Sequence, residues 1–419
     1  MDRRRFLTAS VALSSAALGG CGIGLGFEDG LWHPCGDEPL PQHLARHELV
    51  QQAWDGLDPA RVWDMHVHLA GNGDSGSGAS INPAMLTAWR PFEFAHTALF
   101  FNGACVPAGL RRVDEAYVER LVFLHGGLPP ATRLMLMALD QHHNAQGRPV
   151  PARTVIHVPN AHAARIAQRH PRHFEWIASV HPWREDCVQA LASAAAQRAR
   201  AVKWVPSAMN IDPASPRCDR YYETLARLGL PLISHGGAEH PLLAADDELN
   251  NPLRLRRALD HGLRVVVAHC ATQGENRDLD RGPDGPPVES FRLFARLMDE
   301  PRYEGRLFGD IAAITQTNRP VAFLRELLGR SDWHARLLNG SDYPLPGIVP
   351  LVSMRHLTDR GFIGAGQAAV LKEVRRYSPL LFDFVLKRHL RADGSGFPPS
   401  VFETRGFFEP SPPTRRIEF

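Results

Sequence analysis

Short apolar runs alternate with segments of helical periodicity along most of the chain. The runs predict strands near residues 61–68, 133–139, 174–180, 200–205, 231–235, 264–269, 306–311 and 336–340. One of the helical segments between them stops at Gly229, and another opens with Asn251 as N-cap and Pro252 in its first turn. Continuous apolar strands that alternate with helices are typical of parallel strands covered on both faces. Eight such units predict an α/β fold, a (β/α)8 TIM barrel.

The same pattern divides the chain. The barrel is expected to span residues 60–389, after a tether and entry helix over 22–59. The stretch 69–150 is too long for one strand and one helix, and it predicts an insertion after the first strand. Residues 390–419 combine prolines and aromatics without a period, and predict an extended C-terminal tail packed across the barrel. A doubly wound sheet is the alternative fold, but no GxGxxG turn follows the first strand.

Polar residues stand at the C-terminal ends of five predicted strands. They are His66 and His68 on the first strand, Lys203 on the fourth, His235 on the fifth, His269 on the sixth and Asp342 after the eighth. In a barrel these strand ends meet at one mouth, where active sites form. Because imidazole and carboxylate groups are ligands for zinc and related divalent ions, the pattern predicts a metal site that could activate water.

Side chains of a strand alternate between its two faces. His66 and His68 should therefore both point into the barrel, while Met65 and Val67 point outward toward the helices. Asp64 should share the inner face, where it is a candidate to orient a ligand from behind.

Several other polar residues near the predicted mouth are weaker candidates. His143 and His181 follow the second and third predicted strands and could contact a substrate. Arg184 could bind a substrate carboxylate, although an ion pair with a neighbouring acid is the simpler interpretation. Asp310, in the run FGDIAA, is expected to be mainly structural.

Taken together, these motifs resemble the amidohydrolase superfamily. The resemblance rests on DMHVH at the first strand, Lys203 at the fourth, SHGG at the fifth, AHC at the sixth and NGSDYP at the eighth, and it runs from about residue 60 to 385. The nearest branch is the amidohydrolase-related group of metal-dependent hydrolases and non-oxidative decarboxylases. The order His-x-His, His, His and Asp at strand ends is far more specific than the first pair alone.

The resemblance implies roles for each of these residues. His66, His68, His235 and Asp342 would bind a metal ion, zinc or another divalent metal. His269 would act as general acid or base, or would bind a second metal. Lys203 would carry CO2 and bridge two metals in a binuclear member, but need not be a ligand in a mononuclear one. One or two ions per chain therefore remain open.

Three functions follow from this pattern. The first is hydrolysis of an ester, lactone or amide bond of a small molecule by metal-activated water, with His269 and Asp342 as catalytic residues. The second is non-oxidative decarboxylation of a small aromatic or unsaturated carboxylic acid. The third is a non-catalytic exported lipoprotein that uses the barrel as a binding module, since a fold alone does not fix function.

The charge balance and the first residues of the chain indicate the partners and the cellular location to expect. The 419 residues include 47 basic and 45 acidic side chains, and no block of like charge that would indicate nucleic acid. The start, MDRRRFLTASVALSSAALGGCG, resembles a twin-arginine export signal joined to a lipoprotein signal that ends at a lipidated Cys21. The chain is thus expected to be exported to the periplasmic side and anchored to a bacterial membrane by lipid only.

Cysteine content fits an oxidising compartment without fixing the pairing. Five cysteines remain after Cys21, and they are Cys35, Cys105, Cys187, Cys218 and Cys270. Their scattered spacing does not form a zinc knuckle, and the odd number leaves at least one unpaired. Substrate, metal identity and oligomeric state stay open at this level.

Overall fold

Eight parallel strands form the centre of the protein. The computed structural model describes residues 29–106, 111–238 and 246–409. The strands are β1 (Trp63–His68), β3 (Arg133–Met137), β5 (Phe174–Ile177), β6 (Val202–Trp204), β7 (Leu232–His235), β8 (Val265–Ala268), β11 (Leu307–Asp310) and β12 (Leu337–Leu338). Each falls within one of the eight predicted ranges, and every pairing between neighbours is parallel.

Backbone hydrogen bonds close these strands into a ring. Two sheets, β1-β3-β5 and β6-β7-β8-β11-β12, contain all eight strands. Ala178 and Val202 form a parallel bridge that joins β5 to β6, and Val67 and Tyr343 form another beyond the end of β12. The Met65 amide also donates to the Asn339 carbonyl at 3.2 Å. The strand order around the ring follows the chain, as a barrel requires.

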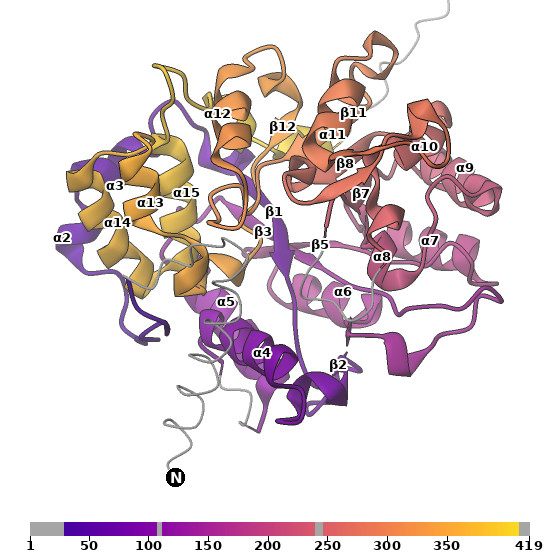
Figure 1. The fold of residues 1–419 in the computed structure, drawn as a ribbon. Helices are drawn as coiled ribbons and strands as arrows, with labels where there is room; N and C mark the ends of the chain where they lie inside the picture. The colour runs from indigo at the N-terminus through magenta and orange to yellow at the C-terminus, as the bar shows by residue number, and fades with distance from the viewer. Residues whose placement is uncertain (1–28, 107–110, 239–245, 410–419) are drawn as a thin grey trace, which may run out of the picture.

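Helices connect successive strands of the ring and cover it from outside (Figure 1). They are α5 (Val113–His125), α6 (Asn160–Arg169), α7 (Cys187–Ala196), α9 (Asp219–Leu228), α10 (Arg256–Asp260), α11 (Ser290–Met298) and α12 (Val321–Gly329). Predicted end signals are present: Gly229 ends α9 with a positive φ of 69°, and the Asn251 side chain accepts from the Leu253 amide at the start of the next helical segment. The local sequence therefore sets where these helices begin and end.

Further elements lie outside the repeating units. α2 (Gln42–Ala45), α3 (Glu48–Gln52), α13 (Met354–Asp359), α14 (Ala365–Tyr377) and α15 (Pro379–His389) gather on one side of the barrel (Figure 1). The long connection between β1 and β3 holds α4 (Pro91–Gly103) in addition to α5, together with β2 (Ser80–Ile81), which pairs with β4 (Ile156–His157). A second short hairpin joins β9 (Glu275–Arg277) to β10 (Pro287–Glu289).

The alternation of faces along β1 is interrupted, and this corrects one prediction. The register between β1 and β3 shifts between Asp64 and Val67, which indicates a bulge. Met65 packs inside the barrel with Ile233 and Val266 rather than pointing outward, whereas Val67 belongs to the outer core as expected. The bulge lets Met65 fill the interior below while the next residue, His66, still reaches the mouth.

After α15 the chain packs against the end of the barrel where β1 begins. Two short helices, α16 (Pro399–Phe402) and α17 (Arg405–Phe408), lie in this segment. The buried Phe408 ring joins the interior cluster that contains Trp63, Met65 and Ile233, and the Thr404 hydroxyl donates to the Trp63 carbonyl. The C-terminal segment thus supplies part of the barrel's own core.

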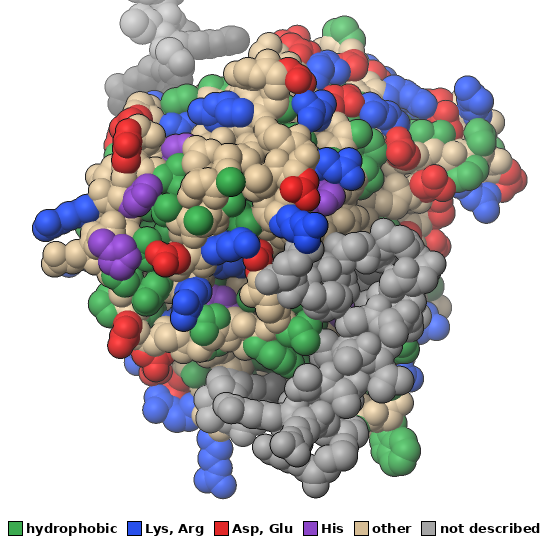
Figure 2. All heavy atoms as spheres, turned by 60° about the vertical axis from the view of Figure 1, so that its left-hand side comes forward, with side chains coloured by type: hydrophobic (Ala, Val, Ile, Leu, Met, Phe, Trp, Pro, Cys, Tyr) green, Lys and Arg blue, Asp and Glu red, His purple; other side chains and the backbone are tan. Residues whose placement is uncertain are grey.

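The surface charge is mixed, as expected from nearly equal numbers of basic and acidic residues. Basic and acidic side chains are interspersed on the face shown in Figure 2, with no large area of one sign among the coloured atoms. Across the residues that the structure describes, no helix combines the length and the apolar character needed to cross a bilayer. The predicted signal over residues 1–21, including Cys21, lies outside the described residues.

We expect Phe408→Ala to lower the free energy of unfolding by about 3 kcal/mol or more, because it leaves a cavity among buried side chains. Urea unfolding followed by circular dichroism measures the change. Phe407→Ala is the matched control, since the neighbouring ring is only partly buried and should lose about 1 kcal/mol. A loss of about 1 kcal/mol or less in Phe408→Ala, no larger than that of the control, would contradict the placement of this ring in the barrel core.

Candidate metal centre

Three histidines and one aspartate converge at the C-terminal end of the barrel strands. Ligand atoms of His66, His68 and Asp342 all lie within 4.8 Å of one another. Asp342 Oδ1 lies 2.9 Å from His68 Nε2 and 3.4 Å from His66 Nε2, while its Oδ2 lies 3.7 Å from His269 Nε2. The carboxylate therefore faces two imidazoles with one oxygen and a third imidazole with the other.

Hydrogen bonds fix the orientation of two of these imidazoles. His66 Nδ1 donates to Asp310 Oδ2 at 2.9 Å, and His269 Nδ1 donates to the Ala312 carbonyl at 3.1 Å. Because a carboxylate and a carbonyl can only accept, each Nδ1 carries the proton and each Nε2 keeps its lone pair. Both lone pairs are thus left available to a metal ion or a proton.

Asp310 has a larger role than the sequence suggested. In addition to the His66 ring, its carboxylate accepts from the His269 amide at 2.7 Å and from the Ala312 amide at 3.1 Å. The expectation that Asp310 is mainly structural was therefore wrong, because it holds two residues of the site. The available signal was its place at the end of a predicted strand, the same position that the other site residues occupy.

Electrostatics favour a charged carboxylate among neutral imidazoles. Burial alone would raise the pKa of Asp342, but His66 and His269 outweigh it and hold this pKa well below its ordinary value. Burial, reinforced by Lys203, lowers the pKa of His66, and burial also lowers the pKa of His269 well below the usual range. At neutral pH the side chains are therefore in the states that bind metal ions.

His235 and Lys203 line the same cavity as these residues. The His235 ring lies 5.2 Å from the His269 ring, but His235 is outside the two compact groups of ligand atoms that include His66. Lys203 is buried, and its Nζ lies 3.5 Å from His66 Nε2. The structure thus brings all six strand-end residues together, with His66, His68 and Asp342 as the tightest set.

The weaker candidates lie elsewhere. Arg184 pairs with Asp140 and Asp186, which is the simpler of its two interpretations. The His143 ring packs on the His181 ring at 4.3 Å, and His181 Nε2 lies 2.9 Å from the Met209 carbonyl. None of Arg184, His143 and His181 lines the cavity that contains the metal-ligand candidates.

Two charged residues, Asp64 and Lys387, form hydrogen bonds with the backbone of the turn that carries Asp342. Asp64 does not orient an imidazole; its Oδ1 instead accepts from the amides of His66 and Ser341, at 3.2 and 2.8 Å. Lys387 on α15, fully buried, donates to the Gly340 carbonyl at 2.7 Å and to Asp383 at 2.6 Å. These contacts fix the two residues that precede Asp342 in the turn. Asp383 and Lys387 have the i,i+4 spacing of a helical ion pair, but nothing in this spacing indicates that the pair is buried against the turn.

Position 340, two residues before Asp342 in this turn, requires glycine. A Cβ on Gly340 would lie 2.5 Å from the His66 Cβ, which is too close for any side chain. Gly340 therefore lets the Asp342 turn approach the strand that carries His66 and His68. This contact explains why NGSD follows the eighth strand.

The site opens into a largely apolar cavity of about 310 Å³. One wall comes from the connection between β1 and β3 and includes Ile81, Met85, Leu99, Phe100 and Phe101. Polar side chains line another part, among them Gln273, Gln316, Asn318 and Arg319. A cavity with apolar walls and a few polar groups suits a small organic molecule.

The donor set fits a divalent metal ion. Imidazole nitrogens and a carboxylate oxygen are preferred by zinc and related first-row ions. The barrel and this His/Asp group together define a metal-dependent enzyme built at the C-terminal mouth of a barrel. A model of the amidohydrolase family matches residues 63–347, more than half of the chain, and the protein belongs to that family.

Solved structures resemble the chain at low identity. A putative 2-pyrone-4,6-dicarboxylic acid hydrolase from Pseudomonas putida is 17% identical, with a TM-score of 0.43 over 77% of this chain and 97% of that one. A 5-carboxyvanillate decarboxylase from Sphingomonas paucimobilis is 11% identical, with a TM-score of 0.41 over 76% and 98%. Scores and identities at this level do not bear on activity. No curated protein matches the chain.

We expect Asp310→Asn to weaken metal binding roughly 10–100-fold, because the His66 ring loses a charged acceptor that fixes its orientation. Isothermal titration of the metal-free protein with Zn²⁺ measures the affinity. Asp140→Asn is the matched control, since Asp140 is also buried and accepts from a backbone amide but lies outside the cavity lining. If both variants bind zinc equally, Asp310 does not support the metal centre.

Removing Lys387 should destabilise the fold by about 3–5 kcal/mol, because Asp383 would be left as a buried charge without its partner. Burial raises the pKa of Asp383 to about 7 against the opposing effect of Lys387. A raised folded-state pKa means that the stability contributed by the neutral acid is lost as pH rises through this value. The penalty of Lys387→Met should therefore be larger above neutral pH than at mildly acidic pH.

Lys372→Met is the control for this substitution. Lys372 forms an ion pair with Asp29 but is much more exposed, so its loss should cost about 1 kcal/mol or less. Urea unfolding at several pH values compares the two variants. A pH-independent loss in Lys387→Met would contradict the assignment of the penalty to Asp383.

Proposed function

We propose that the chain is a hydrolase that cleaves an ester, lactone or amide bond of a small molecule. The observation that carries this proposal is the placement of the buried Asp342 carboxylate among three imidazoles at a largely apolar cavity. His66, His68, His235 and Asp342 would hold a metal ion, with Lys203 and His269 as candidates for a second. Such an ion, when bound, polarises a carbonyl group and lowers the pKa of water.

The two carboxylate oxygens of Asp342 have different roles, one in metal binding and the other in proton transfer. Oδ1 faces His66 and His68 and serves the metal, whereas Oδ2 faces His269 Nε2 at 3.7 Å. Oδ2 can take a proton from attacking water and share it with His269, whose Nε2 keeps a lone pair. His269 then returns this proton to the departing oxygen or nitrogen. The Ala312 carbonyl keeps the His269 ring oriented throughout.

Proton acceptors in the resting site favour hydrolysis over decarboxylation. Decarboxylation ends with protonation of a carbon, which requires a donor. The site instead presents two proton acceptors, the Asp342 carboxylate and His269 Nε2, whose lone pair is free because His269 Nδ1 donates to the Ala312 carbonyl. Decarboxylation of an aromatic acid remains the second candidate, because the buried Arg319 in the cavity lining could bind a carboxylate.

Export is part of this proposal. The Cys35–Cys105 disulfide supports an oxidising compartment, since such bonds are rare in the bacterial cytosol. It is consistent with a twin-arginine signal that ends at Cys21 and with a lipid-anchored protein on the periplasmic side. The remaining described cysteines, Cys187, Cys218 and Cys270, are buried and free.

The metal content of the purified protein tests this proposal. We expect about one divalent ion per chain, or about two if Lys203 is carboxylated, and loss of the ion in His66→Ala. Elemental analysis measures the content, and His143→Ala is the control, because His143 lies outside the cavity lining. Absence of metal in the unsubstituted protein after growth with zinc or manganese would favour the non-catalytic binding module.

A substrate panel then separates the two reactions. Esters, lactones and amides are tested for release of acid, and aromatic carboxylic acids for release of CO2. Hydrolysis should fall at least about 100-fold in Asp342→Asn, which lacks the proton acceptor. Release of CO2 without hydrolysis would assign the site to decarboxylation.

A further inference from the structure

Exposed large hydrophobic side chains are concentrated in one short segment. Among the described residues only three are exposed: Leu86 at 43%, Trp89 at 95% and Phe92 at 50%. All three lie within seven residues, from the end of the 3-10 helix Pro83–Leu86 to the start of α4. Scattered exposed apolar residues need no explanation, but a cluster that includes a fully exposed tryptophan indicates a contact surface.

The segment also forms a wall of the cavity. Met85, just before Leu86, and Leu99 and Phe100, further along α4, line the space that leads to the metal centre. The same stretch therefore presents apolar groups to the cavity on one side and to the exterior on the other. Anything that covers Leu86, Trp89 and Phe92 lies against the wall of the cavity.

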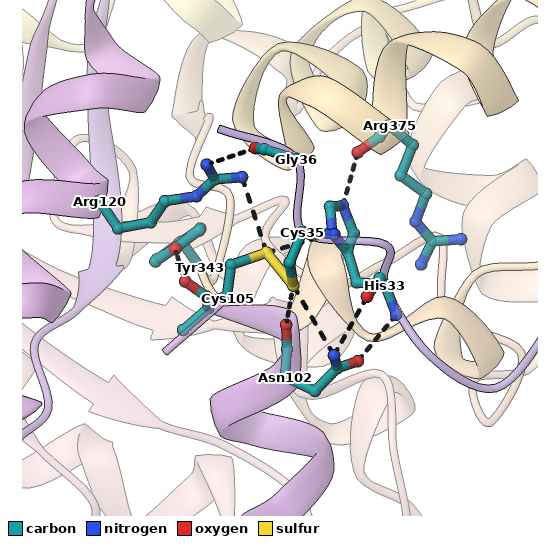
Figure 3. Close-up of a disulfide and its surroundings, with 9 residues drawn as sticks. His33, Cys35, Gly36, Asn102, Cys105, Arg120, Tyr343 and Arg375 are labelled. Atoms are coloured by element: carbon teal, nitrogen blue, oxygen red, sulfur yellow. Dashed lines mark hydrogen bonds between the residues drawn. A yellow bond between two sulfur atoms is a disulfide. The ribbon is translucent and has the colours of Figure 1, made fainter. Parts of the chain in front are cut away.

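The start of the described chain is attached to the other end of the same helix (Figure 3). Cys35 forms a disulfide with Cys105, two residues after α4 ends. The His33 amide donates to Asn102 Oδ1 at 2.8 Å, and Asn102 Nδ2 donates to the His33 carbonyl at 3.2 Å. His33 Nε2 is itself bonded to the Arg375 carbonyl at 2.8 Å. Position 33 is thus fixed beside α4.

The length of chain before position 33 sets how far Cys21 can lie from α4. Cys21 and His33 are twelve positions apart, and an extended chain spans at most about 40 Å over that number. α4 has 13 residues and is therefore about 20 Å long. A lipid on Cys21 would therefore keep the Asn102 end of α4 within about 40 Å of the bilayer, a range that allows the start of this helix to contact lipid.

We propose that Leu86, Trp89 and Phe92 form a membrane-docking edge that inserts into the interfacial region of a bilayer, an inference that rests on the proposed export and lipidation at Cys21. Tryptophan is favoured at this depth, because its ring is apolar and its N–H group can still reach water. A lipid on Cys21 would tether the chain at one point only, so a second apolar contact with the bilayer orients the attached barrel. The docking edge places the wall of the cavity at the membrane and holds the barrel in one orientation.

A second copy of the chain is a poorer occupant of this edge. The three side chains offer roughly 400 Å² of surface. A stable protein interface usually needs about 800 Å² from each partner. Insertion into lipid has no such lower limit, because each apolar side chain partitions by itself.

Tryptophan fluorescence of the full-length protein in vesicles tests the docking edge. All eight tryptophans lie in the described residues, and Trp89 alone among them is exposed. The mature protein is reconstituted in phosphatidylcholine vesicles with and without brominated acyl chains, which quench nearby indoles. We expect quenching in the unsubstituted protein and its loss in Trp89→Phe. Trp183→Phe, which removes a partly buried indole elsewhere, should leave the quenching unchanged.

Three results would overturn the proposal. One is the absence of quenching in the unsubstituted protein, and another is quenching that persists in Trp89→Phe. The third is a mass spectrum of the N-terminal peptide without lipid on Cys21. A dimer that dissociates in Trp89→Ser, seen by sedimentation in detergent, together with no quenching in vesicles, would assign the same side chains to a second copy of the chain.

Discussion

Burying the Asp342 carboxylate at the mouth of the barrel constrains most of the structure around it. A charge removed from water is costly unless neighbouring groups compensate for it. Here the imidazoles of His66, His68 and His269 surround it, and Asp64 and Lys387 fix the backbone just before it, at Ser341 and Gly340. The strand ends must therefore converge, and the Gly340 turn must approach β1 closely. A metal ion would supply the remaining compensation.

The sequence predicted the elements that periodicity controls. Continuous apolar runs located all eight strands, and Gly229 and Asn251 located helix boundaries. The six strand-end residues could be predicted to meet because parallel strands of a barrel present their C-terminal ends to one mouth. This inference needs only strand positions, so it did not depend on details of packing. Membership of the amidohydrolase family agrees with that arrangement.

What the sequence could not provide depends on tertiary contacts. The bulge in β1 turns the Met65 side chain into the barrel, and no residue type in the motif DMHVH indicates that a bulge is present. Lys387 and Asp383 lie in a helix after the last strand, where their burial against Gly340 has no local signature. For Arg184 the sequence left a substrate carboxylate and an ion pair open, and its pairing with Asp140 and Asp186 is the simpler of the two interpretations. Pairwise polar contacts of this kind are decided by packing.

The connection between β1 and β3 lines the cavity at the metal centre and also carries exposed apolar side chains. In the other barrel units the chain passes from strand to strand through shorter segments. This connection contributes the apolar wall of the cavity through Met85 and Phe100, and it carries the exposed Trp89. The disulfide at Cys105 ties its helix to the N-terminal segment. The wall of the cavity and the exposed Trp89 are therefore parts of one connection, while the His/Asp group of the metal centre stands on the barrel strands and the turn after β12.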